Sequence, residues 1–355
     1  MQHLAPAPWV AAGIALVGAG TIAATPITAT LPDLAAAQAP AVTLTAGLDL
    51  FGAWQDVFDA AKTNAEELWT VFDRNPFIAV QQMLVNQAAY QDGLSDGTLT
   101  NDDVLNAMQD NADAVGKAVT FFDADPEYIG GQLGYSAEVN HNMVFLALTG
   151  GAEFLGFPAP DEPIPTIVEL LSSPLSGLLI GALGPSISPW VALANSFDGI
   201  GHALTGDDAD LSAALQELIN IPANMVGAWL NGATLDLSGL IPLINETGLV
   251  PLPEGAALDG LSFAFGGLLT PGDVIMTPSN LGMEHVGGSI LNSLGLHVSN
   301  VPILGEMDAP ATAVGPWGAL ESIGMIIAEQ LGWDGIPNPL GWLDDGVDAG
   351  ADLIG

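Results

Sequence analysis

The sequence predicts a mainly α-helical protein, with an N-terminal helical bundle followed by a Gly/Pro-rich half of short broken helices and room for a few short strands. In the first half, apolar residues recur at the three- and four-residue spacing of amphipathic helices. The 43 Gly and 25 Pro favour interrupted elements elsewhere. Ten-residue segments of strict alternation are missing and aromatic residues make up only 6% of the chain, so the pattern is not that of a regular β-barrel.

Residues 42–157 are predicted to form an acidic helical domain. The first helix carries an apolar stripe at helical spacing from Trp54 to Phe72. Asn75-Pro76 is typical of a cap and a first-turn proline, and predicts the start of a second helix. The residues expected to face inward on that second helix are Phe77, Val80, Leu84 and Ala88.

A turn is expected over residues 92–97, and Thr100 with Asp103 approximates a capping box that starts the third helix. Asp125-Pro126 repeats the cap-plus-proline signature before a helix that reaches about Leu148. The apolar stripe of the third helix consists of Val104, Met108, Val115, Val119 and Phe122.

Residues 158–355 form a Gly/Pro-rich, acidic and apolar region, which begins in the proline-rich linker 157–165. Segments 167–183 and 187–204 are apolar but interrupted by Pro and Gly. Short broken helices, buried in protein or lying at a membrane, are therefore expected there.

Further along the chain, segments 207–220 and 222–230 are predicted as two separate helices. Segments 234–244 and 249–269 alternate apolar and small residues, so the few short strands are expected in them. A last amphipathic helix is predicted from the spacing of Trp317, Leu320, Ile323, Ile327 and Leu331.

Residues 1–37 are predicted to be a signal peptide or an N-terminal membrane anchor. The first 32 residues carry no Asp, Glu, Lys or Arg, and the apolar run 9–25 ends at Pro26. Small residues at 35–37 offer a cleavage site. Because no Lys or Arg precedes the apolar run, a buried core helix remains the alternative.

The charge distribution excludes several classes of partner. The chain has 41 Asp and Glu against three cations, Lys62, Arg74 and Lys117, for a net charge of −38. Of the carboxylates, 24 lie in residues 151–355, where no Lys or Arg is present. A nucleic-acid surface needs clustered cations, so no nucleic-acid partner is expected. Polybasic attraction to anionic lipid headgroups is excluded for the same reason.

Few residues suggest a metal site. Asp92, Asp96 and Asp103 fall at ligand positions of a calcium-binding loop, but Leu94 stands where an oxygen ligand is needed. A turn followed by a capped helix explains the same residues. A metal site at 207–210, which holds three Asp, competes with their ordinary role as acids in a first helical turn.

Catalytic signatures are equally sparse. The histidines at 3, 141, 202, 285 and 297 have no zinc-binding spacing. The nearest approach to a nucleophile turn, 260–264 around Ser262, lacks its final Gly. No catalytic, cofactor-binding or metal-binding residue is assigned, no cofactor is expected, and the protein is predicted not to be an enzyme.

Three stretches of the sequence, taken together, resemble a known family. They are 8–19 with Thr25-Pro26-Ile27, Asn220-Ile221-Pro222-Ala223-Asn224 leading to 230–233, and Phe265-Gly266-Gly267-Leu268-Leu269-Thr270-Pro271-Gly272. The chain resembles, over most of its length, the GjpA-type outer-membrane porin family of mycolic-acid-containing actinobacteria, such as mycobacteria. The resemblance implies a place in the cell envelope and a water-filled channel for small hydrophilic solutes.

The expected function is therefore that of an exported, porin-like protein of the outer membrane, with carboxylates that favour cations. Its expected partners are outer-membrane or envelope lipids, and copies of the chain that form a homo-oligomer. The alternative is a secreted or surface-attached structural or interaction protein without channel activity, whose carboxylates keep an apolar chain soluble.

Overall fold

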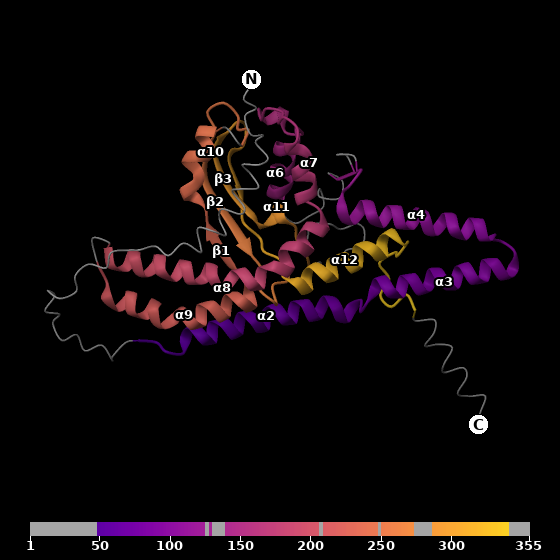
Figure 1. Cartoon of the computed structure of the whole chain (residues 1–355), viewed down its shortest axis with the longest axis horizontal. Helices are drawn as coiled ribbons and strands as arrows, with labels where there is room; N and C mark the ends of the chain where they lie inside the picture. The colour runs from indigo at the N-terminus through magenta and orange to yellow at the C-terminus, as the bar shows by residue number, and fades with distance from the viewer. Residues whose placement is uncertain are drawn as a thin grey trace, which may run out of the picture.

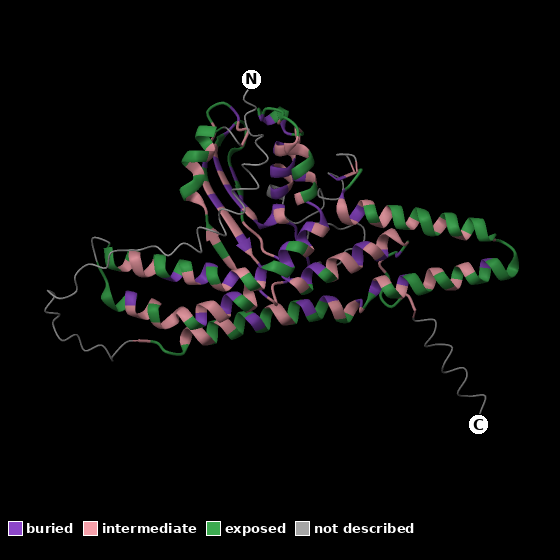
Figure 2. Cartoon of the chain, in the orientation of Figure 1, coloured by how far each residue is buried: buried purple, intermediate pink, exposed green. Residues whose placement is uncertain are grey.

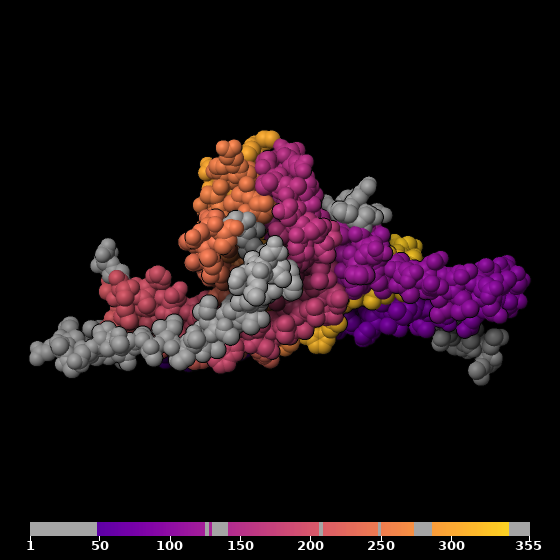
Figure 3. Space-filling view, turned by 45° about the horizontal axis from the view of Figure 1, so that its top comes forward, coloured from indigo at the N-terminus to yellow at the C-terminus, as the bar shows by residue number. Residues whose placement is uncertain are grey.

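A computed structural model describes residues 48–124, 128–129, 139–205, 209–247, 250–272 and 286–340. Long helices lie side by side in an elongated layer, and a small sheet with short helices stands on the middle of that layer (Figure 1, Figure 3). We call these two parts the helical layer and the sheet part. The predicted mainly α class is confirmed. The predicted N-terminal segment 1–37 lies outside the described residues.

The helical layer contains the long helices of both predicted regions. Its members are α2 (Gly52–Arg74), α3 (Ile78–Asp96), α4 (Asn101–Thr120), α8 (Pro174–Thr205), α9 (Leu211–Asn231) and α12 (Pro316–Gln330). Helices α8 and α9 pack against each other, α2 packs on α9, and α12 contacts α8, α3 and α4.

The sheet part is antiparallel, and within the described ranges its strand order is β1-β2-β3-β4. The strands are β1 (Ala233–Asp236), β2 (Ala257–Phe265), β3 (Leu294–Val301) and β4 (Gly305–Ala309). Short helices accompany them: α6 (Val139–Thr149), α7 (Ile164–Leu171), α10 (Ile241–Thr247) and α11 (Ile290–Ser293), with 3-10 turns η2 (Glu153–Leu155) and η3 (Ser238–Leu240). The strands β1 and β2 fall where short strands were expected, but β3 and β4 were not predicted.

The main core lies between the sheet and α6. Phe145 and Phe157, from the predicted region 42–157, pack there with Leu258 and Val298 of the sheet. In the helical layer, the Asn64 side chain of α2 donates to that of Asn231 at the end of α9 (3.1 Å). The two regions predicted from the sequence, 42–157 and 158–355, therefore share cores.

Helix starts in the first region follow local hydrogen-bonding chemistry. Asp49 accepts backbone N–H groups from Phe51 and Gly52 before α2. The capping box of α4 is confirmed: Asp103 N–H donates to the Thr100 hydroxyl (3.2 Å), and Thr100 N–H donates to the Asp103 carboxylate (2.8 Å). Hydrogen bonds from the Thr100 side chain and backbone lower the pKa of Asp103.

The predicted inward face of the second helix is wrong. Phe77 lies before α3 in a left-handed backbone conformation. Its side chain is 71% exposed, and those of Val80 and Leu84 are 54% and 50% exposed. Ile78 and Gln82 are buried instead, and α3 contacts α12. The stripe of the third helix is met in part, because Val119 packs against the main core whereas Met108 and Phe122 are exposed. In the second helix the contacting face is rotated away from the predicted stripe.

The expectation of short broken helices is also wrong for the longest element. Helix α8 is one helix of 32 residues that contains Pro185 and Pro189, although each interior proline costs about 3 kcal/mol. Tertiary packing outweighs this cost, because α8 approaches other backbone segments closely through small residues. Helix α9 likewise continues through Pro222, where two helices were predicted.

Three glycines of α8 form this close contact. A Cβ on Gly177 would overlap the carbonyl of Gly288, and one on Gly184 would overlap the backbone of Gly266. Between them, a Cβ on Gly181 would come within 2.8 Å of the carbonyl oxygen of Gly315. One turn further along, the Ser188 hydroxyl lies 2.9 Å from the Gly266 carbonyl oxygen and can donate to it. Helix α8 is thus fixed against the segments that lead into and out of the sheet.

We expect Gly177→Ala to lower the free energy of unfolding by at least about 2 kcal/mol, because the new methyl group collides with backbone that cannot move aside. Gly201→Ala, in the same helix with open space around the new Cβ, should raise stability by roughly 0.5–1 kcal/mol through helix propensity. Urea unfolding followed by circular dichroism measures both. Equal stability of the two variants would contradict the contact.

Candidate functional site

The outward side of α8 carries an apolar stripe. Leu179, Leu183, Trp190, Phe197 and Leu204 follow one another at intervals of four, seven, seven and seven residues, which places them on one face of the helix. All five side chains are exposed, Trp190 to 63% and Phe197 to 58%. No charged residue interrupts α8 before Asp198. Within the described residues, α8 is the one helix long and apolar enough to cross a membrane.

The buried side of α8 carries mostly small residues, with Ile180 and Val191 as its larger members. Besides Gly177, Gly181 and Gly184, Ser176, Ser188 and Ser196 are buried. A surface helix of a water-soluble protein usually turns its large apolar residues toward the core and its polar residues outward. Helices that pack in lipid instead place small residues at their contacts and large apolar residues outside. Helix α8 has this second arrangement.

Helix α9 repeats the arrangement. Its buried residues are Ala214, Ala223, Gly227 and Ala228. Leu211, Leu218 and Trp229 are exposed and share one face at intervals of seven and eleven residues. The close approach is again specific, because a Cβ on Gly227 would meet the Val57 side chain of α2.

Helix α12 shows the same inversion at its N-terminal end, while Met325 and Ile326 are buried further along the helix. Gly318 and Ala319 are buried, whereas Trp317 and Leu320 are about half exposed. Trp317 and Leu320 belong to the stripe predicted to make this helix amphipathic. The helix is confirmed, and its two largest side chains at the N-terminal end face outward. We call the exposed apolar residues of α8, α9 and α12 the outward apolar stripes.

Helix α2 adds exposed aromatic rings to the helical layer. Trp69 lies 5.7 Å from Phe72, and Phe72 lies 5.2 Å from Phe77, in an edge-to-face pair. Trp69 and Phe58 are both more than half exposed. Figure 2 shows exposed segments along all the long helices of the layer. Exposed apolar area beyond a few hundred Å² marks a surface that binds a partner or a membrane.

The cations of the chain do not lie on the helices that carry the outward apolar stripes. All three cations of the chain lie in α2 and α4, and none in α8, α9 or α12. Lys62 forms an exposed pair with Glu66 at 3.5 Å, and Lys117 lies 4.7 Å from the centre of the Tyr128 ring. A chain of net charge −38 repels anionic headgroups, so the exposed apolar side chains are the feature of this surface that favours contact with an apolar phase.

Two carboxyl groups of α12 are held in apolar surroundings. Burial raises the pKa of Glu321 and of Glu329 to about 7. The Glu321 Oε2 atom is buried and has no hydrogen-bond partner among the residues that the structure describes. Glu329 in turn helps to raise the pKa of the Tyr128 hydroxyl, after the larger effect of burial. An uncharged carboxylic acid is the form that such surroundings favour.

Three of the acids singled out from the sequence accept hydrogen bonds at helix ends. Asp92 and Asp96 lie in the last turns of α3, so the predicted turn begins only after Asp96. Asp96 accepts hydrogen bonds from Thr98 (2.6 and 2.9 Å), while Asp103 caps α4. Asp210 caps α9 through the N–H groups of Ser212 and Ala213; residues 207 and 208 lie outside the described residues. In the described part of the chain no group of three His, Asp or Glu side chains could hold a metal.

The described histidines and Ser262, the candidates for catalysis, lie in different elements. His141 is buried in α6, with Nε2 3.0 Å from the Leu294 carbonyl oxygen. His297 on β3 lies 3.6 Å from Asp308 on β4. Ser262 lies inside β2, opposite Gly295, whereas a nucleophile elbow is a strand-to-helix turn. His202 is exposed on α8, and the histidines at 3 and 285 lie outside the described residues.

Comparison of the chain with protein-family models, with curated proteins and with solved structures finds no match. The porin-like function therefore stays a prediction from the resemblance.

Sequence reasoning missed the outward apolar stripes because it assigned large apolar residues to the inside. A usable signal was present: Gly177, Gly181, Gly184 and Ser188 recur at helical spacing. A small-residue face opposite a large apolar face predicts close helix contacts with the bulky side outward.

The buried carboxyls of α12 predict that stability falls as pH rises from about 4.5 to about 7. In that window the folded chain keeps protons on Glu321 and Glu329 that the unfolded chain releases, so unfolding is progressively favoured until both states are ionised. Urea unfolding at several pH values measures the slope. Glu329→Gln should flatten it, whereas Glu306→Gln, exposed on β4, should leave it unchanged. An unchanged slope in Glu329→Gln would contradict this assignment.

Proposed function

We propose that the protein is an exported component of the cell envelope whose helical layer associates with lipid through the outward apolar stripes. The observation that carries this proposal is the inversion in α8, where glycine and serine face the protein and Leu179, Trp190 and Phe197 face outward. In water this arrangement exposes apolar area that a hydrocarbon phase would cover, at about 25 cal/mol per Å². Exposed tryptophans on α8, α9 and α12 suit a position at the membrane interface.

A second candidate function is a cation-favouring channel for small hydrophilic solutes in the outer membrane. The observation in its favour is that residues 151–355 contain 24 carboxylates and no Lys or Arg. Acidic side chains around a pore attract cations. With α8 as the one candidate span among the described residues, such a channel requires several copies of the chain. A homo-oligomer is thus part of this candidate function.

The lipid proposal is tested at single positions, which the absence of cysteine makes straightforward. Phe197→Cys on α8 and Ile303→Cys on the β3–β4 turn are labelled with a polarity-sensitive fluorophore. Both native side chains are strongly exposed, but only Phe197 belongs to an outward apolar stripe. Addition of phosphatidylcholine vesicles should shift the emission to the blue at position 197 alone. No shift at 197, or equal shifts at both positions, would contradict the proposal.

Vesicle flotation gives the energetic counterpart. Replacing Trp190 and Phe197 by Gln and Asn should remove roughly 3 kcal/mol of apolar transfer free energy, so the affinity for phosphatidylcholine vesicles should fall about a hundredfold. Ile303→Asn is the matched control, because it replaces an even more exposed apolar residue outside the helical layer. If the unaltered chain does not float with the vesicles, the result would instead support the secreted interaction protein.

The channel is tested separately in planar bilayers under a KCl gradient. We expect discrete conductance steps with a reversal potential of the sign for cations, because unpaired carboxylates repel anions. Absence of steps over a wide range of protein concentrations, or selectivity for anions, would remove the channel and leave the lipid association standing.

A further inference from the structure

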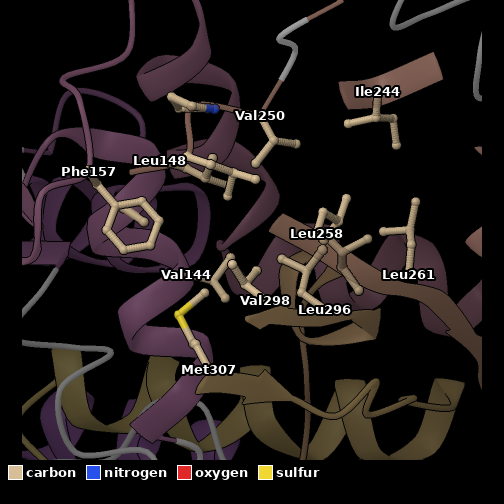
Figure 4. Close-up of a pocket in the computed structure, with 14 residues that line it drawn as sticks. Val144, Leu148, Phe157, Ile244, Val250, Leu258, Leu261, Leu296, Val298 and Met307 are labelled. Atoms are coloured by element: carbon tan, nitrogen blue, oxygen red, sulfur yellow. The ribbon is translucent and has the colours of Figure 1, made fainter. Parts of the chain in front are cut away.

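The sheet part contains an apolar cavity of 220 Å³ between α6 and the sheet. Val144 and Leu148 of α6 line it on one side, Leu258 and Leu296 of the sheet on the other. Figure 4 shows Phe157 and Leu148 across the cavity from Leu258 and Leu261. Every residue of the lining is apolar. The cavity belongs to the sheet part and not to the outward apolar stripes.

The chemistry of the lining restricts what fills the cavity. A cavity with apolar walls offers water no hydrogen-bond partners, and an engineered apolar cavity of about 150 Å³ stays dry and binds benzene. An empty space of this size deprives the side chains around it of dispersion contacts. Natural cores are normally close-packed. The cavity is thus suited to a hydrocarbon group larger than benzene.

Charge decides which hydrocarbon compounds can enter. No Lys or Arg is present after Lys117. Glu246 of α10 and Glu254 before β2 are exposed carboxylates, each two residues from a residue of the lining, Ile244 and Leu252. A fatty acid would bring its own carboxylate to these acids without a cation to pair it, which is unfavourable. An alkyl chain with an uncharged head avoids this repulsion.

Helix α10 is the least buried wall of the cavity. Ile241 and Ile244 pack against the core, and Ile244 lines the cavity. None of the residues of α10 is fully buried, and Leu243 is 59% exposed. Displacing this short helix disturbs fewer buried contacts than displacing α6 or the sheet.

From the lining, the volume and the charge we infer that this cavity binds the alkyl chain of an uncharged lipid or long-chain alcohol. The inference goes beyond the proposed association with lipid, because it concerns one saturable site inside the sheet part. It requires no vesicles, so its failure and the failure of the lipid proposal are distinguishable.

Titration calorimetry of the full chain with 1-octanol and with octanoate tests the inference. The two probes share their chain length and differ in the charge of the head. We expect one saturable site, with octanol bound at least tenfold more tightly than octanoate. No saturable binding, or octanoate bound as tightly as octanol, would overturn the inference.

Variants locate the site. Ala147→Leu fills the cavity from α6 and should weaken octanol binding at least tenfold, whereas Ala112→Leu, exposed on α4, should leave it unchanged. Ala147→Val makes the same change with a smaller side chain, in case the leucine prevents folding. Replacing Trp190 and Phe197 as above should not alter octanol binding. Unchanged binding in a folded Ala147 variant, or its loss when the outward stripe is altered, would place the octanol elsewhere.

Discussion

The close contact between α8 and the backbone at Gly266, Gly288 and Gly315 is the constraint on which the rest of the structure depends. Gly266 directly follows β2, Gly288 precedes α11, and Gly315 precedes α12. One face of α8 therefore fixes three segments around the sheet. A side chain larger than hydrogen at the contact would separate the helical layer from the sheet part. Because small residues occupy most of this face, the largest residues of α8, among them Trp190 and Phe197, lie outside.

That consequence explains why so apolar a chain has modest cores. The largest cluster of buried residues lies in the sheet part, while tryptophans and leucines of the helical layer are half exposed. In a soluble domain this would forfeit much of the apolar free energy available for folding. In contact with a hydrocarbon phase the same side chains lose nothing, and stability depends on how closely the backbones approach.

The sequence allowed some elements to be predicted and others not. Helices α2, α4 and α12 followed from spacing and from the Thr100–Asp103 capping box, because those signals are local. Helix α8 was misjudged because Pro185 and Pro189 are strong local signals, and the glycine contacts that override them join residues about 80 to 135 positions apart. The strands β3 and β4 gain their stability from pairing with each other and with β2, which local propensity does not reveal. The apolar cavity depends on tertiary packing alone and has no local signature.

Within the described residues the outer strands of the sheet are β1 and β4, and unpaired strand edges invite other chains to add a strand. Helix α8 contacts β1, where the Asn195 side chain donates to the Thr234 carbonyl oxygen (2.9 Å). Many proteins protect such edges with lysine, of which this chain has two. On β4 the exposed residues are Gly305, Glu306 and Asp308, and on β1 the exposed positions are Thr234 and Asp236. Carboxylates therefore do here what lysines do elsewhere, and the protection against aggregation depends on their ionisation. In strongly acidic solution these edges become uncharged, and the sheet becomes able to pair with its own copies.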